Sequence, residues 1–302
     1  MLYRDQNNSV TVAAPAKLNL FLKVLGKRSD GYHELETLMV SVGLYDSLRL
    51  IADPSGALSL TCRDAGRVSS GQPARELPPT DGGNLVLKAA ELLRQAAGVP
   101  HGARLELTKR IPLAAGLAGG SSDAAAALVG LNRLWGLNLP PHTLHDLAAR
   151  LGSDVPFFLC PTAAAICRGR GEIIEPLRLP LRLHFVIARP RSGLSTAEVF
   201  RNCRPSSIEW SAARLADACV QGRLDRVMRY LHNSLQEPAE RLNREVTTLK
   251  GWFSRQPFLG HMMSGSGTSY FGLCRSYRQA RQLAARLEAT RLGDVFVARS
   301  RP

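Results

Sequence analysis

The pattern of apolar and polar residues predicts β-strands near the start of the chain. Apolar residues alternate over positions 10–14, and leucine or valine then returns at every second position over 18–24. This two-residue period is that of a half-buried strand. Pro15 stands between the two runs, and because proline cannot donate to a sheet ladder, we expect two separate strands here. Further strands are expected at residues 38–44, 48–51, 58–62, 105–109, 183–188 and 295–298.

Other stretches repeat their apolar residues at the spacing of a helix. Leu144, Leu147 and Leu151 lie three and four residues apart, and Gly152 directly after them is a typical helix end. Helices are also expected over residues 84–94, 124–134, 211–255 and 277–292.

Residues 109–131 combine the end of a strand, a glycine-rich loop and a helix. Gly116, Gly119 and Gly120 leave the backbone free to approach a ligand closely. Residues 121–123, Ser-Ser-Asp, are types that cap helix N-termini, and the alanine run at 124–127 favours a helix. The free N–H groups and the positive dipole end of such a helix form an anion site, for which phosphate is the natural ligand.

This loop matches neither of the common nucleotide-binding motifs. No Lys-Ser or Lys-Thr pair follows its second glycine, and its glycines lack the spacing of the dinucleotide fingerprint. A tight strand-to-helix turn without a ligand is therefore the alternative interpretation.

Polar side chains also occur at three places where the pattern is otherwise apolar or tightly turned. Lys17 and Asn19 lie two residues apart and so share one face of the predicted strand, which is either a functional face or a solvent-facing edge. Tyr32 and His33 follow a tight Asp-Gly turn, a position typical of recognition residues and also of structural ones. Asp154 precedes an apolar run interpreted as a buried strand, so it is either a turn residue or an oriented base.

The composition is that of a folded and basic protein. The 302 residues are 45% hydrophobic, which suffices for two ordinary domains or one large one. Lys and Arg total 39 against 25 acidic residues, so the net charge is +14. That charge suits nucleic acid, an anionic membrane or an anionic small substrate. The basic residues are scattered without a block or a nucleic-acid-binding motif, which favours a solvated surface over nucleic-acid binding.

Cysteine usage and hydropathy indicate a cytoplasmic protein. The six cysteines form no Cys-x-x-Cys pair and are expected to be reduced, mostly buried thiols. No apolar run has the length of a membrane span, and the N-terminus lacks the core of a signal peptide.

Three motifs of the chain resemble those of the GHMP kinases. Residues 112–126, Pro-Leu-Ala-Ala-Gly-Leu-Ala-Gly-Gly-Ser-Ser-Asp-Ala-Ala-Ala, resemble the phosphate loop of that family. Residues 15–22 and 26–35, the latter containing Gly-Tyr-His, resemble the opening signature of one branch, the diphosphocytidyl-methylerythritol kinases. Residues 262–271 resemble the third motif, a glycine loop followed by a strand that packs against the phosphate loop. The resemblance extends from residue 12 to about residue 275, with Ser234 where the branch usually has Asp.

The resemblance implies an α+β fold in two lobes. Residues 1–160 would form an ATP-binding lobe with a ribosomal-protein-like β-α unit and its phosphate loop at 112–123. Residues 161–302 would form a ferredoxin-like lobe that completes a cleft for ATP and substrate.

The resemblance also implies roles for individual residues. Asp154 would accept the proton of the reacting hydroxyl, and Lys17 would hold Asp154 and that hydroxyl in line with the γ-phosphate of ATP. Ser122 is a candidate ligand of Mg²⁺. The residues implied to bind ATP are Asn84, Pro112, Ala114, Ala115, Gly116, Leu117, Ala118, Gly119, Gly120, Ser121 and Ser122. The residues implied to bind the second substrate are Asn19, Tyr32, His33, Thr196 and Phe200.

The implied activity is phosphorylation of the 2-hydroxyl of a cytidine-diphosphate-linked methylerythritol, with ATP and Mg²⁺. A cytosine suits this site because it needs an aromatic face for stacking and hydrogen-bonding groups for its edge. In this interpretation Phe200 lies opposite Tyr32 across the base, whereas the alternative makes Phe200 a core residue. We expect a cytoplasmic monomer or homodimer without nucleic-acid or membrane partners. A kinase of another small alcohol, and a non-catalytic nucleic-acid-binding relative, are the alternatives.

Overall fold

The computed structural model describes residues 1–6, 8–65 and 76–301, which group into two compact units interleaved along the sequence. The first unit consists of Met1–Ala16, Leu44–Leu113 and Ala118–Leu159. The second consists of Lys17–Gly43, Ala114–Leu117 and Cys160–Pro302. The last boundary, between Leu159 and Cys160, lies close to the expected division at residue 160. Two earlier segments, Lys17–Gly43 and Ala114–Leu117, also belong to the second unit, so a single division of the sequence does not separate the two units. The expected functional lobes at 1–160 and 161–302 stay a prediction.

Two long strands contribute residues to both units. Strand β2 (Ser9–Lys27) is continuous, so the predicted break near Pro15 was wrong. Strand β1 (Leu2–Gln6) pairs with β2 only as far as Ala13, and the missing N–H of Pro15 therefore falls beyond this ladder.

Strand β3 (His33–Asp53) is likewise one strand where two were predicted. The polar residue between the expected strands, Asp46, does not interrupt it. Its Oδ1 accepts hydrogen bonds from the backbone N–H groups of Arg110 and Ile111, and this pairing makes a buried carboxylate tolerable there.

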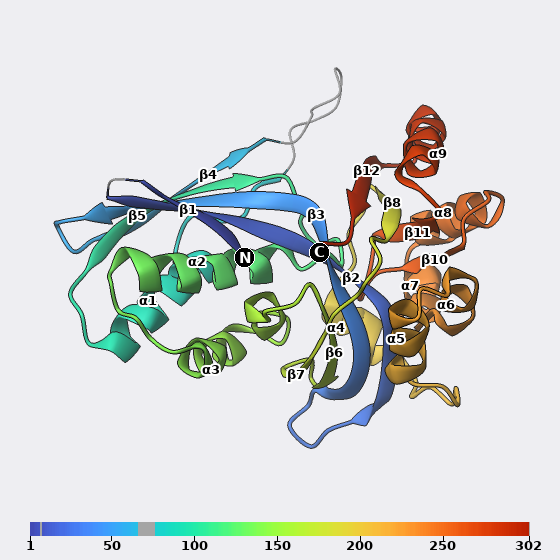
Figure 1. Cartoon of the computed structure of the whole chain (residues 1–302), viewed down its shortest axis with the longest axis horizontal. Coiled ribbons are helices and arrows are strands. Elements are labelled where there is room, and N and C mark those ends of the chain that lie inside the picture. Colours follow the sequence, from blue (N-terminus) through green and yellow to red (C-terminus); the bar gives the residue numbers. More distant parts are fainter. Residues whose placement is uncertain (7, 66–75, 302) are drawn as a thin grey trace. The chain divides into compact units, whose positions relative to one another are not determined.

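In the first unit, helices cover one face of a sheet (Figure 1). The end of β3 pairs with β5 (Gly102–Lys109), which pairs in turn with β4 (Leu58–Asp64). Helices α1 (Leu85–Ala97), α2 (Gly119–Leu134) and α3 (Pro141–Leu151) confirm the predicted helices, and the three pack against one another. Gly130 brings α2 close to the sheet, since an added Cβ would lie 2.5 Å from the Leu50 side chain.

The second unit has its own antiparallel sheet, in the order β10–β11–β8–β12. These strands are β8 (His184–Arg189), β10 (Gly260–Met263), β11 (Tyr270–Cys274) and β12 (Asp294–Arg299). Helices α8 (Arg244–Ser254) and α9 (Tyr277–Thr290) pack against it and bury a cluster of apolar side chains.

The remaining elements of this unit lie along the long strands and around the sheet. Strand β6 (Ala164–Gly169) pairs with the first part of β3 and with β7 (Ile173–Leu177). Strand β9 (His232–Asn233) runs parallel to β2 at Phe21 and Leu22. The other helices are α4 (Thr196–Arg201), α5 (Ala212–Val220), α6 (Leu224–Tyr230) and α7 (Gln236–Leu242).

Helices able to cross a membrane are absent from the described ranges of the chain, where none is both long enough and apolar enough.

Candidate active site

The predicted phosphate loop has an unusual backbone between β5 and α2. Ala114, Gly116 and Ala118 have φ angles of 48°, 71° and 54°, in the left-handed region. This conformation costs a non-glycine residue about 1–2 kcal/mol, so the two alanines show that the surrounding structure imposes this path. Gly116 cannot be replaced without a shift, because an added Cβ would lie 2.1 Å from the carbonyl oxygen of Ser264.

Helix α2 begins at Gly119, two residues before the predicted capping residues. The expectation that Ser121–Asp123 cap the helix was therefore wrong, because the left-handed Ala118 starts it earlier and its carbonyl accepts the N–H of Ser122 at 3.0 Å. Ser122 and Asp123, the fourth and fifth residues of α2, are buried. In the described part of the chain, Ser122 Oγ and Asp123 Oδ1 have no hydrogen-bond partner. The helix start thus keeps its N–H dipoles and a spare hydroxyl oxygen for a ligand.

A buried ion cluster that sequence reasoning missed lies beside this helix start. The Lys109 ammonium lies 2.7 Å from Asp123 Oδ2 and also contacts Asp46 Oδ2. An added Cβ on Gly119 would lie 3.2 Å from the same ammonium. Since Asp46 and Lys109 are 63 residues apart, no local pattern could pair them. The local signal was limited to a charged residue after or at the end of an apolar run, Asp46 after residues 38–44 and Lys109 at the end of residues 105–109.

The electrostatics of this cluster are dominated by burial. Burial raises the pKa of Asp123 to about 8, the Lys109 charge opposes this rise, and the nearby Asp46 adds to it. Burial also works against the charge of Lys109, but the Asp123 and Asp46 carboxylates together raise the Lys109 pKa above its usual value. The two carboxyls also differ in their partners, because Asp46 Oδ1 accepts two backbone N–H groups, whereas Asp123 Oδ1 has no hydrogen-bond partner in the described part of the chain.

In the second unit, Lys17 and Asn19 form a buried pair on one face of β2. Lys17 Nζ donates to Asn19 Oδ1 at 2.5 Å, and Asn19 Nδ2 donates to Thr37 Oγ1 at 2.8 Å. Only 3% of Lys17 and 2% of Asn19 is exposed, so the alternative of a solvent-facing edge was wrong. A buried cation requires such partners, and the pattern therefore marks a specialised position.

Hydrogen bonds hold the middle of the phosphate loop against Lys17 and against the third motif. The Lys17 N–H donates to the Leu117 carbonyl at 3.1 Å, and the Ser269 N–H donates to the Ala115 carbonyl at 3.1 Å. Ser264 Oγ donates to the Gly116 carbonyl at 3.2 Å. The predicted packing of the third motif against the phosphate loop is thus confirmed for residues 115–116.

The predicted cytosine-binding residues also lie in the second unit. The rings of His33 and Phe200 are 5.0 Å apart and inclined by 31°, and Phe200 also packs on the apolar cluster. The exposed ring of Tyr32 lies under the Arg170 guanidinium at 4.6 Å. Burial, with a smaller contribution from the charge of Lys27, lowers the pKa of His33 and so favours the neutral ring. Phe200 therefore contacts His33, and its position opposite Tyr32 across a base stays a prediction.

The other predicted residues are placed as follows. Thr196 Oγ1 lies 2.8 Å from Ser266 Oγ in the second unit. In the first unit, Asn84 caps α1, with its Oδ1 accepting from the Val86 N–H at 2.9 Å and its Nδ2 donating to the Pro79 carbonyl at 2.6 Å. Asp154 is half-buried in a turn after α3. A short 3₁₀ helix, η1 (Pro156–Leu159), follows Asp154, so the buried strand expected there was wrong.

Comparisons with known proteins agree with these local features. Residues 84–161 match the family model described as the GHMP kinases N terminal domain, and residues 215–291 match the GHMP kinases C terminal domain. A 4-diphosphocytidyl-2-C-methyl-D-erythritol kinase of Pelotomaculum thermopropionicum is 43% identical over 283 residues, covering 93% of this chain and 94% of the relative. The kinase of that name from Geobacillus thermodenitrificans is 41% identical and covers 87% of this chain and 88% of the relative.

Solved structures show the same relationship. A crystal structure of 4-(cytidine 5'-diphospho)-2C-methyl-D-erythritol kinase superimposes with a TM-score of 0.75 at 36% identity, covering 97% of this chain and all of that one. Homoserine kinase from Cytophaga hutchinsonii has a TM-score of 0.73 at 20% identity, over 99% of this chain and 96% of that one, and shows the shared fold alone. The two-lobed α+β fold is therefore confirmed, and the chain belongs to the GHMP kinases and, among them, to the 4-diphosphocytidyl-2-C-methyl-D-erythritol kinases.

Proposed function

We propose that this protein transfers the γ-phosphoryl group of ATP to the 2-hydroxyl of 4-diphosphocytidyl-2-C-methyl-D-erythritol. Identity above 40% to kinases of that name, over most of both chains, supports this substrate. The observation that carries the proposal is the buried Lys17–Asn19 pair, bonded through the Lys17 N–H to the phosphate loop at Leu117. A buried ammonium fixed beside an anion-binding loop is the arrangement that phosphoryl transfer requires, because the reaction depends on positioning and charge stabilisation.

The phosphate loop and the start of α2 bind the triphosphate of ATP. The left-handed backbone of Ala114, Gly116 and Ala118, and the start of α2 at Gly119, support this role because they leave N–H groups without intrahelical partners. Lys17 offsets negative charge on the transferred group. Asn84 and Pro112 are the further ATP-binding residues of the proposal, with Asn84 acting through its position at the start of α1 rather than through its cap-bonded amide.

Asp154 accepts the proton of the substrate hydroxyl as the general base. Its half-buried position in a turn, directly before the buried Val155, supports the role because such a turn fixes a carboxylate while leaving it accessible. The proton moves from the 2-hydroxyl to an Asp154 carboxylate oxygen as the hydroxyl oxygen bonds to the γ-phosphorus and the bond to ADP breaks.

Ser122 is the residue that would hold Mg²⁺. Its buried Oγ, unpartnered in the described part of the chain, is a hard oxygen donor of the kind this ion prefers. Within the described ranges no group of three or more His, Cys, Asp or Glu side chains could hold a metal ion. A single hydroxyl still fits, because Mg²⁺ in nucleotide sites is held mainly by phosphates and water. When bound, the ion neutralises the triphosphate.

Tyr32, His33, Thr196 and Phe200 bind the cytidyl end of the substrate, with Asn19 near the alcohol. The His33 ring, with its centroid 5.0 Å from that of Phe200, supports this role, since burial favours its neutral form and a neutral imidazole both donates and accepts hydrogen bonds at a base edge. We assign the protein to the cytoplasm as a monomer or homodimer that acts on small molecules and not on nucleic acid.

The experiment that tests this function is identification of the product. Purified protein, ATP, Mg²⁺ and the diphosphocytidyl alcohol should yield ADP and a phosphomonoester at the 2-position, seen by phosphorus NMR. Mevalonate and homoserine, offered separately, should yield no phosphorylated product. Phosphorylation of either alcohol, with the diphosphocytidyl alcohol unchanged, would assign the site to another small-alcohol kinase.

A further inference from the structure

The structure assigns a positioning role to Asn233, assisted by Gln236. These two residues hold the turn at Ser264, and through it they fix the phosphate-loop backbone at Gly116 and the Lys17–Asn19 pair. The inference rests on the proposed function, since it concerns residues of that same site. The segment around Asn233 had no role predicted from the sequence.

Asn233 uses its whole side-chain amide on this turn and on the start of α7. It ends β9 and is only 8% exposed. Its Nδ2 donates to the carbonyls of Met263 at 2.8 Å and Gly265 at 2.9 Å, which are the residues on either side of Ser264. Its Oδ1 accepts the N–H of Leu235 at 2.9 Å. Only a side chain with two N–H donors and an acceptor satisfies all three groups.

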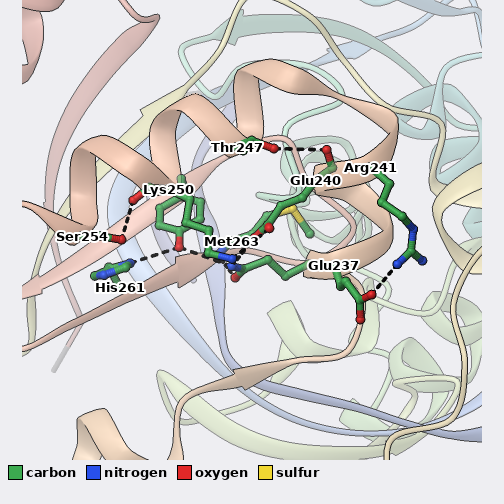
Figure 2. Close-up of polar contacts among 10 residues, drawn as sticks. Glu237, Glu240, Arg241, Thr247, Lys250, Ser254, His261 and Met263 are labelled. Atoms are coloured by element: carbon green, nitrogen blue, oxygen red, sulfur yellow. Dashed lines mark hydrogen bonds and ion pairs between the residues drawn. The ribbon is translucent and has the colours of Figure 1, made fainter.

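Gln236 holds the other side of Met263. Its Oε1 accepts the Met263 N–H at 3.0 Å, so the N–H and the carbonyl of one residue are each held by a side chain from outside the turn. Gln236 is itself oriented by Glu240, whose side chain extends toward Met263 in Figure 2. The second carboxylate oxygen of Glu240 accepts from Lys250 at 2.9 Å. In the same network, His261 Nδ1 lies 3.0 Å from the hydroxyl of Tyr270. The hydrogen bonds of Asn233 and Gln236 to Met263 are thus part of a continuous set of polar contacts.

The turn contacts residues of the candidate active site directly. Ser264 Oγ donates to the Gly116 carbonyl at 3.2 Å and accepts the Asn19 N–H at 3.3 Å. Gly265 packs so closely that an added Cβ would lie 3.2 Å from Lys17 Nζ. Because these contacts are close, a displacement of the turn would also displace Gly116, Asn19 and Lys17.

The side chains that hold the turn also border open space. A cavity of about 560 Å³ is lined by Asn233, Gln236 and Met262, among others. Ser264 itself is fully buried, so the hydrogen bonds of Asn233 and Gln236 add to close packing in fixing the turn.

The test compares Asn233→Asp with a matched control, Asn132→Asp. Asn233→Asp keeps the acceptor for Leu235 but directs a carboxylate oxygen at two carbonyl oxygens. Asn132 is a half-buried asparagine of α2 in the first unit that bonds the N–H and carbonyl of Leu139, so it undergoes the same chemical change away from the turn. Hydrogen exchange by mass spectrometry and steady-state kinetics are measured for both proteins.

Asn233→Asp should accelerate amide exchange in residues 260–269 and 115–119. It should also lower kcat about 10- to 100-fold, as expected for misplaced reacting groups, with KM for the cytidyl substrate within about threefold of wild type. Asn132→Asp should change neither property. Combining Asn233→Asp with Ser264→Ala should lower kcat by less than the product of the single effects, because both act through the same turn.

Unchanged exchange in residues 260–269, a kcat within twofold of wild type, or multiplicative effects with Ser264→Ala would overturn the inference. If Asn233→Asp does not fold, Gln236→Leu, which removes the bonds of Gln236 to the Met263 N–H, to Glu240 and to Tyr270, is held to the same criteria. The exchange measurement uses no substrate. An inactive wild-type protein would therefore refute the proposed function, while the exchange result still decides whether Asn233 holds the turn.

Discussion

Lys17 and Asn19 point to the same side of β2 and are joined by a 2.5 Å hydrogen bond from the ammonium to the amide oxygen, with almost no exposed surface. Their spacing of two residues is what places them together, because a strand directs alternate side chains to one face. The backbone N–H of Lys17 also bonds the phosphate loop at Leu117. One strand therefore fixes both the proposed catalytic cation and the backbone that binds the nucleotide.

Asp154→Asn should lower turnover on the order of 10²–10⁴-fold, the usual contribution of a general base. An amide has nearly the same size but cannot accept the hydroxyl proton, so binding of ATP and of the cytidyl substrate should be retained. Calorimetric titration with each ligand, next to the turnover assay, separates the two effects. Loss of binding in step with turnover would show that Asp154 is not the base.

Phe200→Ala and Tyr32→Ala should each raise KM for the cytidyl substrate about 5- to 150-fold, because stacking on an aromatic ring contributes about 1–3 kcal/mol per base. KM for ATP should not change. Tyr277→Ala is the matched control, since this exposed tyrosine also lies under an arginine, Arg299, at 4.9 Å. Equal effects of Tyr32→Ala and Tyr277→Ala would argue against a cytosine site at Tyr32.

Asp123 should make the protein less stable as the pH rises. Its pKa is about 8 in the folded chain and near the ordinary 3.8 in the unfolded chain. Between these values the folded chain holds a proton that the unfolded chain has lost, so this contribution is complete below about pH 4 and is lost as pH rises to about 8.

Asp123→Asn should remove that pH dependence, because an amide does not titrate. Urea unfolding at pH 5 and at pH 8 should show that wild type loses more free energy of unfolding over this interval than the variant. Asp5→Asn serves as the control, since its partner Arg133 lowers the pKa of the exposed Asp5, whose titration lies below this interval. An equal change in wild type and Asp123→Asn would mean that Asp123 is ionised throughout.

Gly116→Ala should destabilise the protein by more than about 2 kcal/mol, since the added methyl combines a left-handed backbone with a clash against the Ser264 carbonyl. Gly120→Ala is the control for stability, because its Cβ would meet only the Leu85 side chain at 3.8 Å. Thermal unfolding of both variants should show a lower melting temperature for Gly116→Ala alone. Equal melting temperatures would contradict the packing described at this loop.

Elements with local signals were predictable from the sequence. The apolar periodicity of residues 84–94 indicated α1, and Gly152 marked the end of α3. The errors came where tertiary partners overrode local preference. Pro15 does not interrupt β2, because it lies beyond the ladder with β1, and Asp46 does not interrupt β3, because backbone N–H groups 64 and 65 residues away satisfy it.

The site was predictable only in part for the same reason. The two-residue spacing indicated that Lys17 and Asn19 share a face, and the resemblance suggested their role. Nothing local showed that Asn233 would bond to Met263, 30 residues later, or that Lys109 would lie between two aspartates from other elements. Such contacts are set by sheet register and helix placement, so they follow only from the folded chain.

The most direct test of the central claim is the rate of ADP release from ATP and Mg²⁺, measured with and without 4-diphosphocytidyl-2-C-methyl-D-erythritol. The proposed function predicts slow release from ATP alone, a large increase on addition of the cytidyl alcohol, and collapse of that increase in Asp154→Asn. A rate that is indifferent to the cytidyl alcohol in the folded wild-type protein would contradict the proposed function.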